Sequence, residues 1–151
     1  MTWDYVAGFI DGEGCILAKR KGYALRISQT NFEVLNSILK FTGKGYVNPI
    51  KKRKPHWKDA WIYDSGGYEH TYFLLINVVD KLIVKKQEAE HAIEVLKDRI
   101  EFLQQRDKEV REKAKKVAEL RNKGWTYREI GKELNHDFSY MRRLLKRYPQ
   151  N

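Results

Sequence analysis

The nine residues from Val6 to Gly14, Val-Ala-Gly-Phe-Ile-Asp-Gly-Glu-Gly, limit most strongly what this chain can fold into. The apolar residues at positions 6, 9 and 10 recur at helical spacing, which predicts one short helix. Gly8 and Gly12 are four residues apart and therefore share one face of it. Each glycine costs about 1 kcal/mol relative to alanine in a helix interior. Two glycines on one stripe indicate that another backbone comes close there.

Two carboxylates, those of Asp11 and Glu13, stand at the predicted end of this helix, just before Gly14. A negative charge at that position meets the negative end of the helix dipole, which is locally unfavourable. The placement therefore favours a bound cation over a contribution to stability. The plainer alternative is an amphipathic helix that ends at a glycine cap.

In its residue order, Val6–Gly14 resembles the signature of the LAGLIDADG homing endonucleases, in the single-motif form that ends Asp-Gly-Glu-Gly. The resemblance implies that two such helices pack side by side through Gly8 and Gly12. It also implies that Glu13 projects from the helix end and binds a divalent metal, Mg²⁺, together with the main-chain carbonyl of Gly12. Because the chain carries one such segment and no internal copy, we expect a homodimer in which two Glu13 side chains meet.

Composition indicates an intracellular protein with an anionic partner. The 151 residues carry a net charge of +10, and residues 106–147 hold fourteen Lys and Arg against seven Asp and Glu, a net +7 that leaves +3 for residues 1–105. Cys15 is the only cysteine, which excludes an intrachain disulfide and a cysteine zinc site. No apolar run approaches the ~20 residues of a membrane span, and Met1–Asp4 does not begin a signal peptide. We therefore expect no secretion and no membrane partner.

A β-hairpin is predicted for residues 15–30, with its turn at Lys21 and Gly22. Alternation places Ile16 and Ala18 on an apolar face together with Leu25 and Ile27. The opposite face is assigned to the phosphates and base edges of DNA. It comprises Lys19, Lys21, Arg26 and Ser28. The alternative is an ordinary solvated sheet face.

Gln29 ends the second strand, and Asn31 is a good N-cap for a helix that Gly43 closes. In the LAGLIDADG family a polar residue at the end of this strand lies beside the metals, and Gln29 matches that place. The plainer alternative is a glutamine that is hydrogen-bonded to nearby backbone.

A second hairpin follows, with strands at residues 46–51 and 57–64 and a basic connection at residues 51–55. Pro49 makes its first strand an edge or irregular one. In the last strand we place Ile62 in the core, which turns Trp61 and Tyr63 toward the nucleic acid. The DNA-facing residues predicted for this hairpin are Asn48, Lys51, Lys52, Arg53, Trp61 and Tyr63.

A helix over residues 68–82 completes the order helix, hairpin, helix, hairpin, helix. Its predicted buried face comprises Tyr72, Phe73, Leu75, Ile76 and Val79. This order is the α+β, αββαββα core of the LAGLIDADG family, with an antiparallel DNA-binding sheet, and the resemblance covers residues 3–105. Leu82–Ala89 resembles the family's closing stretch, in which a lysine contacts water near the scissile phosphate. Lys85 takes that place, with Lys86 as the alternative register. The catalytic residues implied by the resemblance are Glu13, Gln29 and Lys85.

Residues 106–151 predict a helical linker and a small all-α domain. Thr126 and Asp137 are N-caps for two short helices, and Asn135 fits the left-handed position between them. The segment resembles the helix-turn-helix domains of resolvases and sigma-like factors. The outward residues assigned to DNA are Ser139, Tyr140, Arg142, Arg143 and Lys146. The alternative is a purely structural three-helix module.

Together these features predict a homodimeric, Mg²⁺-dependent endonuclease that hydrolyses one phosphodiester per strand of a near-palindromic double-stranded DNA site. Two alternatives come from other classes. One is a transcription regulator that pairs a degenerate LAGLIDADG domain with a helix-turn-helix. The other is a maturase that uses the same fold to bind structured intron RNA. Cleavage with and without Mg²⁺ separates the enzyme from both.

Overall fold

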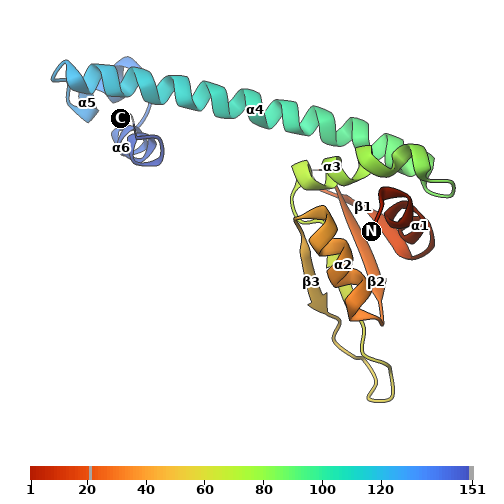
Figure 1. The fold of residues 1–151 in the computed structure, drawn as a ribbon. Helices are drawn as coiled ribbons and strands as arrows, with labels where there is room; N and C mark the ends of the chain where they lie inside the picture. Colours follow the sequence, from red (N-terminus) through yellow and green to blue (C-terminus); the bar gives the residue numbers. More distant parts are fainter. Residues whose placement is uncertain (21, 150–151) are drawn as a thin grey trace. The chain divides into compact units, whose positions relative to one another are not determined.

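The computed structural model describes residues 1–20 and 22–149, so the predicted DNA-binding residue Lys21 lies outside the described part of the chain. Contacts divide the chain into two compact units, Met1–Glu101 and Phe102–Asn151. The first unit holds the sheet and the helices α1 to α3, and the second holds α5 and α6 (Figure 1). The long helix α4 (Lys86–Asn122) contributes residues to both units.

Helix α1 (Trp3–Glu13) ends just before Gly14, as the sequence predicts, but begins before Val6, where the predicted helix starts. Thr2 caps its first turn, because the Thr2 hydroxyl accepts a hydrogen bond from Tyr5 N at 3.3 Å. Gly14 ends the helix in an extended conformation and begins the first strand. The buried face of the helix consists of Val6, Ala7 and Ile10.

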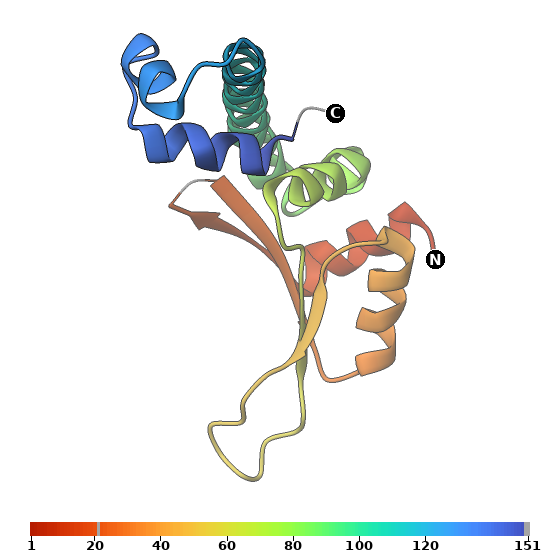
Figure 2. The same cartoon turned by 90° about the vertical axis from the view of Figure 1, so that its left-hand side faces the viewer.

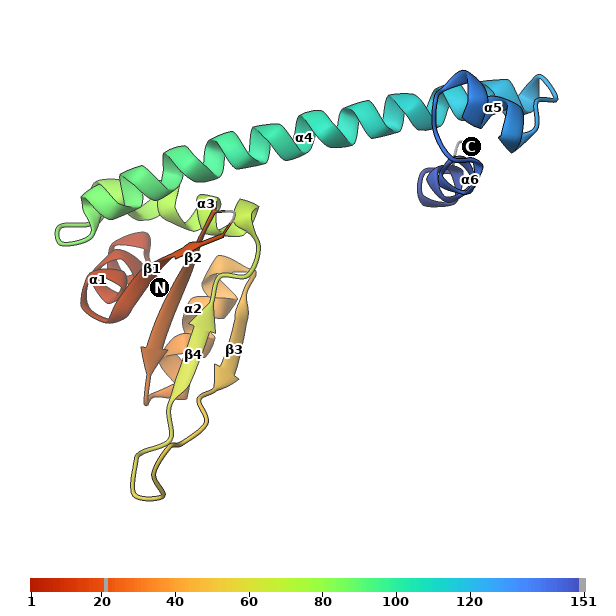
Figure 3. The same cartoon turned by 180° about the vertical axis from the view of Figure 1, so that it is seen from behind.

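Four antiparallel strands form one sheet in the order β1-β2-β4-β3 (Figure 3). The strands are β1 (Gly14–Lys19), β2 (Gly22–Gln29), β3 (Tyr46–Pro49) and β4 (Trp61–Asp64). Pro49 lies on the edge strand, as predicted, because proline lacks the N–H that a central strand needs.

The second hairpin is shorter than its sequence predicts. Beyond Pro49 a backbone hydrogen bond joins the two strands from Ile50 N to Ala60 O at 2.8 Å. Residues 51–59 are an exposed connection, within which Trp57 N donates to Lys54 O at 3.2 Å.

Helices cover one face of this sheet. Helix α1, helix α2 (Phe32–Thr42) and helix α3 (Tyr68–Val78) all contact its strands, and Figure 2 shows α1 and α2 on the same side of it. A short 3-10 turn (Val79–Lys81) follows α3, and the first turns of α4 add Ala89, Ala92 and Leu96 to the same core. The order αββαββα predicted from the sequence is therefore confirmed. Among the described residues, no helix has both the length and the apolarity to cross a membrane.

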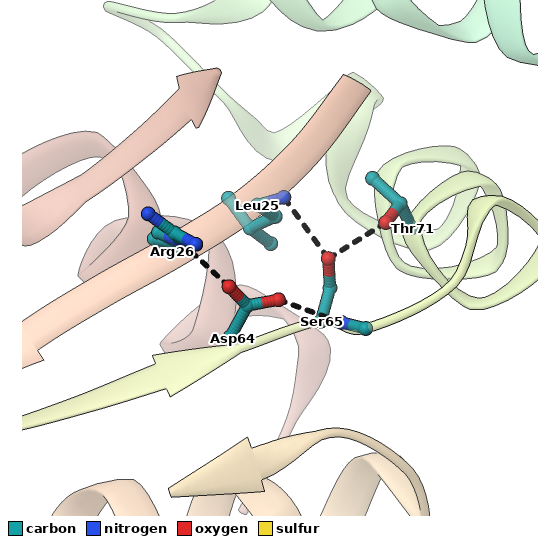
Figure 4. A network of polar contacts seen from close by, with 6 residues as sticks. Leu25, Arg26, Asp64, Ser65 and Thr71 are labelled. Atoms are coloured by element: carbon teal, nitrogen blue, oxygen red, sulfur yellow. Dashed lines mark hydrogen bonds and ion pairs between the residues drawn. The ribbon is translucent and has the colours of Figure 1, made fainter. Parts of the chain in front are cut away.

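The buried face of α3 differs from the one that its apolar pattern predicts. Phe73 and Ile76, expected inside, are each 42% exposed, whereas polar His70 and Thr71 face the core. The Thr71 hydroxyl lies 2.6 Å from Ser65 Oγ, and this hydrogen bond stabilises the inward position of Thr71 (Figure 4).

The second unit builds its own core around the C-terminal part of α4, α5 (Tyr127–Glu133) and α6 (Phe138–Arg147). Thr126 and Asp137 cap the two short helices, as predicted, and Thr126 exchanges hydrogen bonds with Glu129 in a capping box. Asn135 has a φ of 50° and takes the predicted left-handed position. The buried residues of this core are Ala114, Val117, Ile130, Met141 and Leu144.

Candidate catalytic site and nucleic-acid interface

The C-terminal end of α1 presents an exposed carboxylate, that of Glu13. Glu13 is the last residue of the helix and is exposed. Gly14 pairs with Ile27, so Glu13 lies immediately before the β1–β2 ladder and near the end of β2. No side chain or backbone group in the described residues forms a hydrogen bond or ion pair with the Glu13 carboxylate. Both of its oxygens are therefore available to a ligand.

Asp11, two residues earlier, is committed to the chain's own backbone. Its Oδ2 accepts from Ile83 N at 2.7 Å, and its Oδ1 accepts from Lys85 N at 3.0 Å. In return, Lys85 Nζ donates to the main-chain carbonyl oxygen of Asp11. This bond satisfies one of the last carbonyls of α1, which have no partner within the helix. The segment before α4 is thereby fastened to the end of α1, and Lys85 lies at the same helix end as Glu13.

Asp11 contributes to the stability of the fold through these hydrogen bonds. The expectation that its position favours a bound cation over a contribution to stability is therefore wrong. Burial raises the pKa of Asp11, but hydrogen bonds from the backbone N–H groups of Ile83, Lys85 and Val84 outweigh burial and hold the pKa below its ordinary range. This role is not visible in the sequence, because the partners of Asp11 lie 72 and 74 residues away and are backbone groups, which leave no residue-type signal.

We expect Asp11→Asn to lower the free energy of unfolding at pH 7 by about 1.5–3 kcal/mol, the usual worth of hydrogen bonds to a charged group. Because the folded-state pKa of Asp11 lies below its unfolded value, the carboxylate stabilises above the unfolded pKa, and this stabilisation is lost as pH falls through the folded pKa. Urea unfolding measured between pH 7 and pH 3 should show that the free energies of unfolding of the wild-type protein and the Asp11→Asn variant converge as the pH falls. Asp98→Asn, which changes an exposed acid on α4, is the control; an equal loss in both variants would contradict the assignment.

Gln29 ends β2, as predicted, and its side chain makes local contacts. Gln29 Oε1 accepts from Thr30 N at 2.7 Å and from the Thr30 hydroxyl at 3.1 Å. Gln29 is thus hydrogen-bonded to nearby backbone, which is the alternative to a place beside a metal that the sequence also allows. Its position opposite Trp61 places it on the helix-covered face, at the end of the strand.

The face of the sheet that these helices leave free carries polar and basic side chains. The pairings Cys15↔Arg26, Ser28↔Ile62 and Asn48↔Ile62 place these side chains on one face, because directly opposed residues in an antiparallel ladder point the same way. The predicted DNA-facing residues on it are Lys19, Arg26, Ser28 and Asn48. The face also carries Tyr46, which is 64% exposed and which the sequence analysis did not select.

The predicted orientation of β4 is wrong. Tyr63 is fully buried in the core opposite Ile27, and Trp61 packs against the same core and against the Phe32 ring. Ile62, assigned to the core, points to the free face instead. Tyr63 and Trp61 therefore leave the set of DNA-facing residues. The alternation of residues along β4 does not decide which of Ile62 and Tyr63 faces the core, since both are apolar enough to be buried.

A polar network explains why Tyr63 is the inward residue. Its hydroxyl donates to the carbonyl oxygen of Lys44 at 2.9 Å and lies 3.2 Å from Thr42 Oγ1 and 3.1 Å from His70 Nε2. Burial raises the pKa of Tyr63 and lowers the pKa of His70, so both side chains are neutral at pH 7. These partners satisfy the hydrogen-bonding capacity of the buried Tyr63 hydroxyl, so the inward position carries no unpaired polar group.

The connection between β3 and β4 adds exposed cations to the interface. Lys51, Lys52 and Arg53 are all exposed, as a DNA-contacting loop requires. Lys52 Nζ lies 3.0 Å from Asp59 Oδ1, so the charge of Lys52 is partly offset within the loop.

The surface of α6 presents most of its predicted contact residues. Ser139, Arg142, Arg143 and Lys146 are exposed, whereas Tyr140 is half-buried against the second core. The Tyr140 ring lies 5.3 Å from the His136 ring, so Tyr140 contributes partly to packing. Two exposed cations of α5, Arg128 and Lys132, were missed by the sequence analysis, although their spacing of four residues places them on one helix face.

The two glycines of α1 face open space in this chain. A Cβ atom added to Gly8 or Gly12 would meet no atom within 4 Å, and both residues are exposed. Their helix face is therefore free to receive another backbone. Among the described residues no group of three or more His, Cys, Asp and Glu side chains is arranged to hold a metal ion, so one chain offers Glu13 without a second free acid beside it.

Comparison with solved structures identifies the fold. The homing endonuclease I-CvuI, in complex with the I-CreI target in 2 mM Mg with the DNA not cleaved, matches with a TM-score of 0.50 and 22% identity, over 63% of this chain and 65% of its own. A second I-CvuI complex contains its target Sro1.3 and 2 mM Ca. The archaeal intron-encoded homing endonuclease I-Vdi141I, complexed with DNA, matches with a TM-score of 0.51 and 18% identity, over 96% of this chain and 94% of its own.

This chain thus spans just under two thirds of I-CvuI. No protein-family model and no curated protein matches the sequence. At these identities the likeness concerns the fold: a mixed α+β structure with a four-stranded antiparallel sheet, of the kind found in LAGLIDADG homing endonucleases.

Proposed function

We propose that this chain is a site-specific double-strand DNA endonuclease of the homing type. The observation that carries the proposal is the end of α1, where the Glu13 carboxylate and the Lys85 ammonium both lie beside the start of an exposed polar and basic sheet face. The DNA-bound state of both similar endonucleases, I-CvuI and I-Vdi141I, supports DNA as the substrate.

The proposed active form is a homodimer. One chain offers one free carboxylate at this place, and packing two α1 helices through Gly8 and Gly12 would bring two Glu13 side chains together. A two-fold protein contacts a two-fold DNA site, so the target would be near-palindromic.

The donor set fits Mg²⁺, which prefers carboxylate, carbonyl and water oxygens. Glu13 of each copy and the main-chain carbonyl of Gly12 would hold it, and the bound cation would polarise a phosphoryl oxygen and lower the pKa of water. Lys85 Nζ would offset negative charge that develops at the phosphate. The Gln29 carboxamide would orient the attacking water, while Lys19 and Lys51 would hold phosphates along the sheet.

The direct test is selection of cleaved sites from a randomised DNA library, once in Mg²⁺ and once in EDTA. We expect a defined near-palindromic site to be cut on both strands in Mg²⁺ and bound without cleavage in EDTA. Specific binding without cleavage in Mg²⁺ would instead favour a transcription regulator, which the capped helix pair α5–α6 would also suit. Preference for structured intron RNA over DNA would favour a maturase.

We expect Lys85→Ala to slow single-turnover cleavage about a hundredfold, the usual effect of removing one electrostatic stabiliser of a reacting group. The fold should survive, because the backbone N–H of Lys85 still donates to Asp11. Lys86→Ala is the matched control, since Lys86 is the neighbouring lysine and is exposed. Equal rates for both variants would place Lys85 outside the catalytic machinery.

The second unit is proposed to strengthen DNA binding. We expect the double change Arg142→Gln and Arg143→Gln to weaken target binding and to reduce the slope of log affinity against log salt by ~0.9 for each phosphate that the protein no longer neutralises.

Truncation after Glu109 should weaken binding further and shorten the protected footprint, but should leave a dimer that still cleaves. An unchanged footprint and salt slope would show that the second unit does not hold DNA.

A further inference from the structure

An ion pair on the free face of the sheet joins the middle strands. Arg26 of β2 and Asp64 of β4 are directly opposed, and Arg26 Nε donates to Asp64 Oδ2 at 2.6 Å (Figure 4). The two side chains retain 38% and 23% exposure, so solvent reaches the pair from the free face. The other carboxylate oxygen, Asp64 Oδ1, accepts from Gly66 N at 2.9 Å. Asp64 is therefore fixed by the backbone on one side and holds the guanidinium on the other.

We propose that Asp64 orients Arg26 to recognise a guanine base in the major groove of the target. This inference rests on the proposed function, because it requires DNA on the free face of the sheet. It adds a base-specific contact and a positioning residue to that function.

The geometry leaves the recognition end of the arginine uncommitted. The hydrogen bond to Asp64 uses Nε, and within the described residues neither Nη1 nor Nη2 donates a hydrogen bond. These two nitrogens form the planar fork that matches O6 and N7 of guanine, which is the commonest specific arginine contact with DNA. A guanidinium that is already held in place loses less rotamer freedom on binding than a free one.

The carboxylate also indicates a base edge and not a phosphate as the contact. Asp64 carries a negative charge at neutral pH: burial raises its pKa, but the Gly66 N–H and the Arg26 guanidinium outweigh burial and lower the pKa. A fixed anion beside Arg26 reduces the attraction of the pair for the phosphate backbone. Guanine presents neutral acceptors, so the local anion is tolerated there. Neighbouring Lys19, which has no such hydrogen-bonded partner in the described structure, suits the phosphates better.

The experiment is the randomised-site selection described above, scored separately for binding in EDTA and for cleavage in Mg²⁺. For the wild-type protein we expect one position in each half-site to prefer guanine by about five- to 150-fold, the range of one bidentate contact. Arg26→Lys keeps the charge and removes the fork, so it should abolish the preference at that position alone. Asp64→Asn should reduce the preference several-fold at the same position, with all other positions unchanged.

Asp59→Asn is the matched control, because it makes the same chemical change in an ion pair of the same hairpin. Asp59 is 71% exposed and pairs with Lys52, which has no planar fork, so this variant should keep the full guanine preference. Thermal unfolding checks the fold of every variant; if Asp64→Asn fails to unfold cooperatively, Arg26→Lys alone decides.

The outcomes separate the inference from the proposed function. If the wild-type protein selects no DNA sequence, the proposed function fails. If it selects a site and the Arg26 and Asp64 variants select the same site with the same preferences, the inference fails and the pair only joins β2 to β4. Loss of guanine preference in Asp59→Asn as well would also overturn it.

Discussion

Replacing Glu13 with Gln is expected to reduce strand cleavage in Mg²⁺ by about a hundredfold or more, while the affinity for uncut target changes by no more than a few-fold. The amide keeps the shape of the side chain and removes the charge that a divalent cation needs. The fold should be unaffected, because no described residue is hydrogen-bonded to the Glu13 carboxylate. Single-turnover cleavage of the selected site, with a binding titration in EDTA, measures both quantities.

Glu90→Gln supplies the control for this prediction, since Glu90 is an exposed acid on α4 that has no proposed role. Cleavage at the wild-type rate by the Glu13 variant would remove Glu13 from the metal site and leave the proposed mechanism without its central acid. A parallel loss of binding would instead indicate that the substitution disturbs the DNA interface.

A bulky residue at Gly8 is expected to separate the two copies of the proposed dimer. The space around Gly8 is open within the chain, so Gly8→Leu should fold as a monomer, and leucine has the better helix propensity by about 1 kcal/mol. In a pair of α1 helices packed through this face, the same side chain would force the backbones apart. Sedimentation should therefore show loss of the dimer, and a cleavage assay should show loss of double-strand cleavage.

Ser37→Leu, on the exposed surface of α2, controls for the effect of adding an exposed leucine elsewhere. The packing argument requires that this control remain a dimer. An undisturbed dimer in the Gly8 variant would mean that the copies associate through another surface, or that the protein acts as a monomer.

Features that depend on neighbouring residues were predictable from the sequence. The caps Asn31, Thr126 and Asp137 each accept a bond from a backbone N–H two or three residues onward, and Asn135 takes its turn conformation alone. The end of α1 at Gly14 is of the same kind. Each is encoded by a residue type at a fixed offset, so a single sequence is enough to place it.

Features that depend on distant backbone groups were not predictable. The inward position of Tyr63 depends on the carbonyl of Lys44 and the ring of His70, which only the folded chain brings together. The sequence likewise gives no distinction between Asp11 and Glu13, because both acids lie at the end of the same helix. The difference between them lies in two N–H groups of the segment before α4, and every residue except proline supplies an N–H.

The position of Pro49 has a consequence for self-association in concentrated solution. An outermost strand normally exposes a row of unpaired N–H and C=O groups on which another chain can add a strand, the first step toward aggregates. Here the outermost strand β3 is only four residues long and ends at a residue without an N–H, next to a cluster of lysines. Strand addition on that side would lack a hydrogen bond and would bring like charges together. The sheet is thus protected against edge-to-edge polymerisation along β3.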